Sequence, residues 1–212
     1  MNNDLLIQQP STPTQGHPGT QLLLMFHGVG ADPQGLVGLG EQLATALPQA
    51  WIVSIRSPQV SDLGRGWQWF SVLGITEENR PARIAAAMPL FKQTLARWQA
   101  RAGVPPERTA LLGFSQGANM ALACTQEPEM LASKVIAIAG RYATLPTRGH
   151  PQQQVHLLHG DRDPIMPVAH SIDASAQRKQ LGLPVTLDVF SDLAHAIDER
   201  VVNTLRNYLA AP

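Results

Sequence analysis

The sequence predicts one α/β domain in which helices cover both faces of a mostly parallel sheet. Six short apolar runs do not alternate polar with apolar residues, which is typical of strands that are buried on both faces. Longer stretches with a helical spacing of apolar residues separate these runs, so strands and helices alternate along the chain. The 212 residues fit a single domain that can bury a full core without disulfides or metals.

The expected strands follow directly from these runs. They span residues 21–26, 50–55, 109–113, 134–139, 154–158 and 185–190. Leu5–Ile7 is a candidate edge strand, and residues 10–19 have the composition of a polar connector. We therefore divide the chain into an N-terminal segment, residues 1–19, and one domain, residues 20–212.

Apolar residues at helical spacing predict the helices. Three such segments run from Leu36 to Leu47, from Ile84 to Trp98 and from Ile197 to Tyr208. Within the second, Pro89 is expected to kink or restart the helix, because proline lacks an N–H and its ring crowds the preceding turn. A further helix is predicted over residues 118–125, whereas residues 57–79 and 141–154 are predicted to be loops.

Composition and charge exclude several classes of partner. The 16 Lys and Arg side chains balance 16 Asp and Glu, so the chain lacks the charge excess that binds nucleic acid or an anionic membrane. The sequence has neither a signal-peptide pattern nor a long apolar run, so we expect a cytoplasmic protein that does not insert into membranes. Cys124 is the single cysteine, which excludes an intramolecular disulfide and favours a buried free thiol.

The chemistry centres on Gly113-Phe114-Ser115-Gln116-Gly117, a G-x-S-x-G motif between a predicted strand and a predicted helix. A serine on such a turn has a strained backbone, and its neighbours two positions away must be small so that strand and helix can approach. By chance, a chain of this length would show the pattern about once in fourteen sequences. The alternative is a glycine-rich turn with a helix-capping serine, so the prediction of Ser115 as a nucleophile depends on its context.

A serine hydroxyl needs a base that removes its proton and a third group that fixes the tautomer of that base. In parallel α/β folds, reacting groups gather beyond the carboxyl ends of the strands. Asp163 follows the strand that ends at Leu158, and His195 follows the strand that ends at Phe190. Ser115, Asp163 and His195 therefore occur in the order, and at the strand ends, that a catalytic triad on such a sheet requires.

Competing residues exist for both partners of the serine. Asp161 lies on the same loop as Asp163, but it follows a glycine and suits a local turn, whereas Pro164 favours an extended Asp163. Further carboxylates near His195 are those of Asp188, Asp192 and Asp198. Surface, packing or backbone-bonding roles are expected for the other histidines, which are His17, His27, His150, His156, His159 and His170.

Acyl transfer also requires two N–H groups that stabilise the negative charge on the substrate carbonyl oxygen. One expected donor is Gln116, immediately after the nucleophile, and the other is Val29 in the loop after the first long strand. Glycines on both sides of Val29 allow this backbone to turn toward Ser115. Taken alone, the loop also fits a glycine-rich turn that leads into a helix.

Together these segments resemble the phospholipase/carboxylesterase family, small lidless hydrolases that include bacterial esterases and acyl-protein thioesterases. The resemblance spans nearly the whole chain and rests on His27-Gly28-Val29-Gly30, Trp69-Phe70, the Ser115 motif, His159-Gly160-Asp161-Arg162-Asp163-Pro164 and Ala194-His195. It implies a compact, lidless α/β-hydrolase fold, with Asp163 as triad acid and with Val29 and Gln116 as oxyanion donors. Many relatives have an aspartate after the Trp-Phe pair, where this chain has Ser71, so substrate contacts of that loop do not carry over.

The combined prediction is a serine carboxylesterase that hydrolyses short- to medium-chain esters through an acyl-enzyme intermediate. Acyl-protein thioesterase and lysophospholipase are the enzymatic alternatives, and a binding protein on the same scaffold is the non-enzymatic one. Trp69 and Phe70 are expected to line the substrate pocket, because aromatic rings offer large apolar contacts at low entropic cost. The expected partner is a small-molecule ester or acyl thioester, with neither cofactor nor metal, and the sequence does not indicate an oligomeric state.

Overall fold

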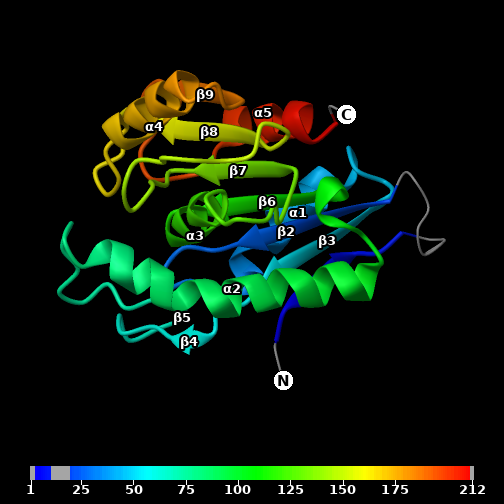
Figure 1. The fold of residues 1–212 in the computed structure, drawn as a ribbon. Coiled ribbons are helices and arrows are strands. Elements are labelled where there is room, and N and C mark those ends of the chain that lie inside the picture. Colours follow the sequence, from blue (N-terminus) through cyan, green and yellow to red (C-terminus); the bar gives the residue numbers. More distant parts are fainter. Residues whose placement is uncertain (1–2, 11–19, 211–212) are drawn as a thin grey trace.

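The computed structural model describes residues 3–10 and 20–210, and its centre is a seven-stranded sheet (Figure 1). The strands are β1 (Leu5–Gln8), β2 (Gln21–Phe26), β3 (Ala50–Ile55), β6 (Thr109–Phe114), β7 (Lys134–Ile138), β8 (Gln154–Gly160) and β9 (Val185–Phe190). Their spatial order is β1-β3-β2-β6-β7-β8-β9, and every neighbouring pair is parallel except β1 with β3. The predicted parallel sheet is confirmed, and Leu5–Ile7 belongs to an antiparallel edge strand.

The strand order reverses between β2 and β6. The chain steps from β2 outward to β3, crosses back over the sheet to β6, and then proceeds strand by strand to β9. Such a reversal places the loops after β2 and β6 beside each other at the carboxyl edge of the sheet, where ligands bind in open α/β folds. Loops carrying Val29 and Ser115 are therefore neighbours by topology.

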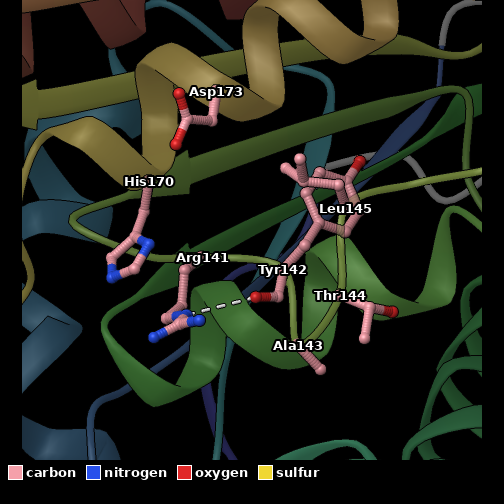
Figure 2. Close-up of a pocket in the computed structure, with 7 residues that line it drawn as sticks. All are labelled: Arg141, Tyr142, Ala143, Thr144, Leu145, His170 and Asp173. Atoms are coloured by element: carbon pink, nitrogen blue, oxygen red, sulfur yellow. Dashed lines mark hydrogen bonds between the residues drawn. The ribbon is translucent and has the colours of Figure 1, made fainter. Parts of the chain in front are cut away.

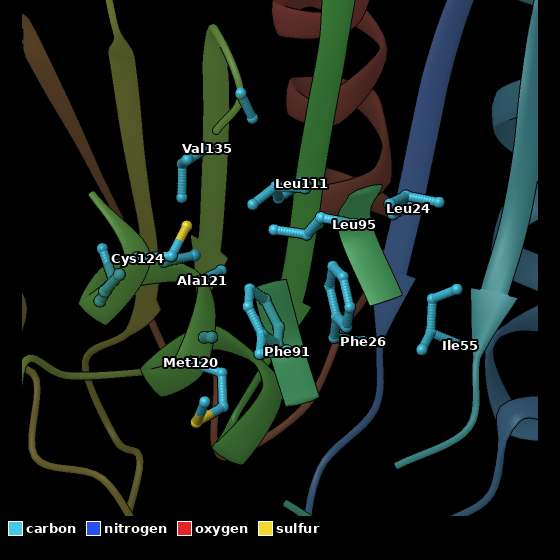
Figure 3. Close-up of a cluster of buried hydrophobic side chains, with 14 of the residues drawn as sticks. Leu24, Phe26, Ile55, Phe91, Leu95, Leu111, Met120, Ala121, Cys124 and Val135 are labelled. Atoms are coloured by element: carbon cyan, nitrogen blue, oxygen red, sulfur yellow. The ribbon is translucent and has the colours of Figure 1, made fainter. Parts of the chain in front are cut away.

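Helices cover both faces of the sheet, as predicted. They are α1 (Val37–Ala44), α2 (Arg80–Ala102), α3 (Gln116–Cys124), α4 (Ala169–Gln180) and α5 (Glu199–Ala210). Because successive side chains of a strand point to opposite faces, Leu24 and Phe26 of β2 pack with Phe91 of α2, whereas Leu23 and Met25 pack with α1 and α5. Figure 3 shows the first of these two cores, which also includes Met120 and Cys124 of α3.

Several details differ from the prediction. Pro89 lies inside α2, which continues through it as one helix of 23 residues rather than restarting. The predicted loop at residues 57–79 contains a short antiparallel ribbon of β4 (Gln59–Val60) and β5 (Trp67–Gln68). Most of the predicted connector at residues 10–19, and His17 with it, lies outside the described residues. Among the described helices, none has the length and apolar character needed to cross a membrane.

Candidate active site

Ser115 lies on a sharp turn between β6 and α3. Its φ of 54° and ψ of −115° are conformations that residues with a Cβ rarely adopt. The Ser115 N–H donates to the carbonyl of Ile138 on β7, and the Ser115 carbonyl accepts from the N–H of Asn119 in α3. The N···O distance is 3.0 Å in both hydrogen bonds. Sheet and helix together therefore hold the strained conformation in place.

Glycine is required on both sides of this turn. A Cβ on Gly113 would lie 2.4 Å from the backbone nitrogen of Ala118, and a Cβ on Gly117 would lie 2.2 Å from the carbonyl oxygen of Phe26. Both distances are far inside van der Waals contact, and neither backbone partner can move without displacing β2 or α3. The spacing of the motif thus reflects close approach of a strand and a helix, as the sequence predicted.

Asp163 and His195 are in direct contact. His195 Nδ1 lies 2.6 Å from Asp163 Oδ2, and Asp163 Oδ1 accepts from the N–H groups of Ile165 (2.9 Å) and Met166 (2.8 Å). Burial raises the pKa of the Asp163 carboxyl, but hydrogen bonds from Met166, His195 and Ile165 more than offset this and bring the pKa below its ordinary value. Because a carboxylate only accepts, Nδ1 of His195 carries a proton and Nε2 remains available as a base.

The competing aspartates have other partners. Asp161 Oδ1 accepts from the N–H of Asp192, and Asp192 in turn forms an ion pair with Arg162. Asp188 accepts from the Tyr208 hydroxyl, and Asp198 accepts from Arg200. Of the aspartates considered from the sequence, Asp163 is therefore the one that bonds to His195.

The His195 ring lies beside the serine turn. Its centroid is 4.8 Å from that of Phe114, the residue that precedes Ser115. Within the described residues no direct hydrogen bond joins the Ser115 hydroxyl to His195. Catalytic hydrogen bonds are often long in proteins without substrate and shorten in the complex, so this arrangement is consistent with a serine–histidine pair.

The predicted oxyanion donors border the same turn. A Cβ placed on Gly28 would lie 3.2 Å from Ser115 Cβ, which shows how closely the loop after β2 approaches Ser115. In that loop Gly30 N–H donates to the Trp67 carbonyl and Ala31 N–H to the Gly28 carbonyl, whereas Val29 N–H has no acceptor among the described residues. Gln116 begins α3, where a helix N–H has no intrahelical acceptor. Both N–H groups are thus available to a ligand.

Comparisons with known proteins identify the family of this chain. The family described as Phospholipase/Carboxylesterase matches residues 7–211. The chain belongs to this family. Esterase YpfH of Escherichia coli K12 is 43% identical over 208 residues, which cover 98% of this chain and 88% of the relative.

More distant relatives extend the picture. Acyl-protein thioesterase 1 of Kluyveromyces lactis is 25% identical over 176 residues, covering 76% of this chain and 77% of the relative. Among solved structures, esterase PE8 superposes with a TM-score of 0.81 at 28% identity and covers 98% of this chain and 96% of that one. The resemblance inferred from the motifs is confirmed, and this phospholipase/carboxylesterase family member is an ester hydrolase with the α/β-hydrolase fold.

Trp69 and Phe70, which the sequence predicts to line the substrate pocket, are buried in the structure. Trp69 is only 1% exposed and Phe70 only 4%, and both belong to the hydrophobic core. The Trp69 ring packs against Phe26 and, edge to face at 5.0 Å, against Phe91. Trp69 therefore anchors the long loop on the core instead of forming a wall that substrate reaches from solvent, because its neighbours in α2 and β2 enclose it. Trp67 is half-buried, and Arg56 lies over its ring.

A side chain of the serine turn secures this loop. Gln116 Oε1 accepts from the N–H of Trp69, and Gln116 Nε2 donates to the carbonyl of Phe70. The donor–acceptor distance is 2.8 Å in both hydrogen bonds. The sequence reasoning assigned a role only to the backbone N–H of Gln116. Its buried amide joins the nucleophile turn to the loop between β5 and α2, and no local sequence signal indicated this contact.

A cavity that the sequence did not predict opens between the loop after β7 and the start of α4 (Figure 2). Its volume is about 200 Å³, and it is lined by Arg141, Tyr142, Ala143, Thr144, Leu145, His170 and Asp173. The Arg141 N–H donates to Asn119 Oδ1, which ties the cavity wall to α3 behind Ser115. The Arg141 guanidinium pairs with Glu77, so residues before α2 and after β7 meet at this cavity.

Burial shifts the pKa of several side chains outside the proposed triad. Cys124 is buried on α3, and burial raises the pKa of its thiol, so it is not a competing nucleophile. Burial also lowers the pKa of His156 to about 4 and depresses the pKa of His27, so both are neutral packing or backbone-bonding residues, as expected from the sequence. Across residues 3–10 and 20–210, no group of three or more His, Cys, Asp or Glu side chains is arranged to hold a metal ion.

Proposed function

We propose that the chain is a serine carboxylesterase that hydrolyses short- to medium-chain carboxylic esters through an acyl-enzyme on Ser115. The observation that carries this proposal is the 2.6 Å contact between His195 Nδ1 and Asp163 Oδ2 beside the strained Ser115 turn. A histidine whose Nδ1 is bonded to a carboxylate has Nε2 free to act as a base. We propose that this nitrogen accepts the serine proton.

In the proposed reaction, Ser115 Oγ attacks the ester carbonyl carbon while His195 Nε2 takes the serine proton. The N–H groups of Val29 and Gln116 stabilise the resulting oxyanion. His195 returns the proton to the alcohol oxygen as the carbon–oxygen bond breaks, which leaves an acyl group on Ser115. A water molecule, deprotonated by His195, then attacks the acyl carbon, and release of the acid restores the serine.

The preference for modest acyl groups rests on the size of the site. Residues 57–79 form the long loop that covers the region near Ser115. Within this loop, Trp69 and Phe70 are buried in the hydrophobic core. Each methylene adds about 0.8 kcal/mol of binding only while it is buried, so longer chains gain nothing once they outgrow the site.

Acyl-protein thioesterase activity is the second candidate. The relative from Kluyveromyces lactis carries that name, and a thioester is cleaved by the same triad chemistry. The more similar relative, at 43% identity, is named an esterase, which favours the carboxylester. Lysophospholipase activity is a third possibility within the same family.

The proposal is tested with a fluorophosphonate probe, p-nitrophenyl esters and an acyl thioester. We expect one probe molecule to attach to Ser115, and we expect Ser115→Ala to abolish labelling and to lower kcat by about 10⁴-fold or more. Ser133→Ala, at an unrelated serine before β7, is the matched control and should keep labelling and turnover. Full activity in Ser115→Ala, with labelling at another residue, would refute the serine-hydrolase mechanism.

A further inference from the structure

We propose that His159 is a positioning residue that fixes the orientation of the Asp163 carboxylate toward His195. The role rests on the proposed triad. His159 is near the end of β8 and only 1% exposed. Its Nε2 lies 2.6 Å from the carbonyl oxygen of Met166 and 3.5 Å from Asp163 Oδ2. Two imidazoles therefore lie near the Asp163 carboxylate, and Oδ2 is the oxygen that both approach.

The protonation of His159 follows from its partners. A carbonyl oxygen can only accept, so His159 Nε2 carries a proton and donates it to Met166. His159 Nδ1 lies 2.7 Å from the Ser171 hydroxyl of α4, which can donate to it. The ring is therefore the neutral Nε2–H tautomer, selected by the Met166 carbonyl, and both of its nitrogens have partners.

These contacts form a continuous chain of hydrogen bonds. The Ser171 hydroxyl donates to His159 Nδ1, and His159 Nε2–H donates to the Met166 carbonyl. The N–H of the same Met166 donates to Asp163 Oδ1, while Asp163 Oδ2 receives the proton of His195 Nδ1. By bonding to the Met166 carbonyl, His159 helps to fix the turn whose N–H groups hold Asp163 Oδ1, and Oδ2 is left for His195.

The second effect is electrostatic. His159 Nε2, whose N–H donates to the Met166 carbonyl, also lies 3.5 Å from Asp163 Oδ2 and places partial positive charge near that oxygen. Charged or titratable groups that act on His159 are those of Asp163, His195 and His170. Burial lowers the pKa of His159 despite the neighbouring carboxylate, so the ring stays neutral and does not replace His195 as the cationic partner of Asp163.

The test compares His159→Phe with His159→Gln in the full chain. Phenylalanine removes both ring nitrogens, whereas the glutamine amide can place an N–H close to the position of Nε2. We expect His159→Phe to lower kcat by about 10-fold, the effect of one hydrogen bond to a charged group, and to move the acid limb of kcat/KM to higher pH. The limb moves upward because a carboxylate without its second donor stabilises the His195 imidazolium more strongly. His159→Gln should restore kcat and the limb toward those of the unmodified protein.

A second buried histidine of β8 provides the matched control. His156→Phe also removes a buried imidazole from this strand, but His156 bonds to Thr186 and does not face Asp163, so it should leave the acid limb in place. If His159→Phe does not fold, Ser171→Ala tests the same contacts, because the ring then loses the partner of Nδ1 that helps to hold its orientation. A lower kcat with the limb displaced upward is expected there too.

Two results would overturn the proposal. One is a His159→Phe or Ser171→Ala protein with lower thermal stability but an unchanged acid limb and kcat, which would make the contacts structural only. The other is a His159→Gln protein as impaired as His159→Phe. Failure of the proposed function looks different, since the unmodified protein would then neither react with fluorophosphonate at Ser115 nor hydrolyse esters.

Discussion

At the residue scale, Asp161 and Asp163 are two positions apart and have opposite surroundings. Asp163 is buried against His195, whereas Asp161 is exposed and bonded to the backbone of Asp192. We expect Asp163→Asn to lower kcat by about 10²- to 10⁴-fold, because an amide facing Nδ1 favours the wrong histidine tautomer. Steady-state kinetics at matched thermal stability measure this, with Asp161→Asn as the control that retains activity. A large loss in Asp161→Asn alone would reverse the assignment of the acid.

Some of these residues are predictable from sequence for a simple physical reason. The order of Ser115, Asp163 and His195, each just beyond a buried apolar run, is a local property, because parallel strands end at one edge of the sheet. The burial of Trp69 is not local, since it depends on Phe26 and Phe91 from other elements. His159 is similar, because its partners Met166 and Ser171 come together only when the loop after β8 and α4 have folded.

At the scale of elements, Gln116 connects α3 to the loop between β5 and α2. Gln116→Met, of similar shape, would leave the buried N–H of Trp69 and the carbonyl of Phe70 without partners. We expect the free energy of unfolding to fall by about 2 kcal/mol, the usual cost of unpaired buried polar groups. Urea denaturation measures the change, and Gln152→Met at an exposed position is the control. Equal stability of the two variants would show that the amide bonds contribute little.

A second element-level prediction concerns pH and the contact between β8, β9 and α5. His156 stacks on Tyr208 at 3.8 Å and bonds to Thr186, and burial, aided by the charge of Lys134, lowers its pKa to about 4. An unfolded histidine binds a proton near pH 6.5, whereas the folded one does so only near its lowered pKa. This contribution to stability is therefore complete above about pH 6.5 and is lost as pH falls toward 4.

The measurement is thermal unfolding between pH 7.5 and about pH 4.5, across the range in which an unfolded histidine gains its proton. The unmodified protein should lose stability on acidification, and His156→Phe should lose less. Some loss should remain in the variant, because burial also lowers the pKa values of His27 and His159. Parallel slopes in the two proteins would contradict the assigned role of His156.

The ends of helices and strands are less predictable from the sequence than the presence of these elements. Pro89 predicts an interruption by its own chemistry, yet Ile84, Met88, Phe91 and Leu95 are buried in one core on both sides of it. The packing of these four side chains keeps α2 continuous through Pro89, since each turn buries apolar surface against the same face of the sheet. The ribbon of β4 and β5 is equally non-local, because an additional bridge joins Trp67 to Ala31.

At the scale of the whole molecule, the compact, lidless fold limits the size of the substrate. We expect kcat/KM for p-nitrophenyl esters to peak at short to medium acyl chains, roughly two to eight carbons, because burial stops increasing beyond that length. No rise in rate is expected above the micellar threshold of the substrate. A maximum at palmitoyl esters or an interfacial jump would instead favour the thioesterase or lysophospholipase alternative.

The overall architecture was the most predictable level. Nearly continuous apolar runs occur where both faces of a strand are covered, so the pattern itself encodes the parallel sheet and its two helical layers. The small cavity beside α3 is not predictable, because its lining residues come from the loop after β7 and from α4, which are separate in the sequence. Loop conformation depends on contacts between residues that are distant in the sequence, and the spacing of apolar residues along the chain does not predict such contacts.

The short strand β1 closes the sheet at β3, whose six residues are all buried. Asp4, just before it, accepts hydrogen bonds from the N–H of Arg56 and from Trp98 Nε1, and it also pairs with Arg97 of α2. A chain shortened past Gln8 would therefore present β3 as an open apolar edge, ready to pair with the edge of another molecule. Self-association of such truncated chains, visible as high-mass species in size-exclusion chromatography, is the expected consequence for any expression design that trims or replaces these residues.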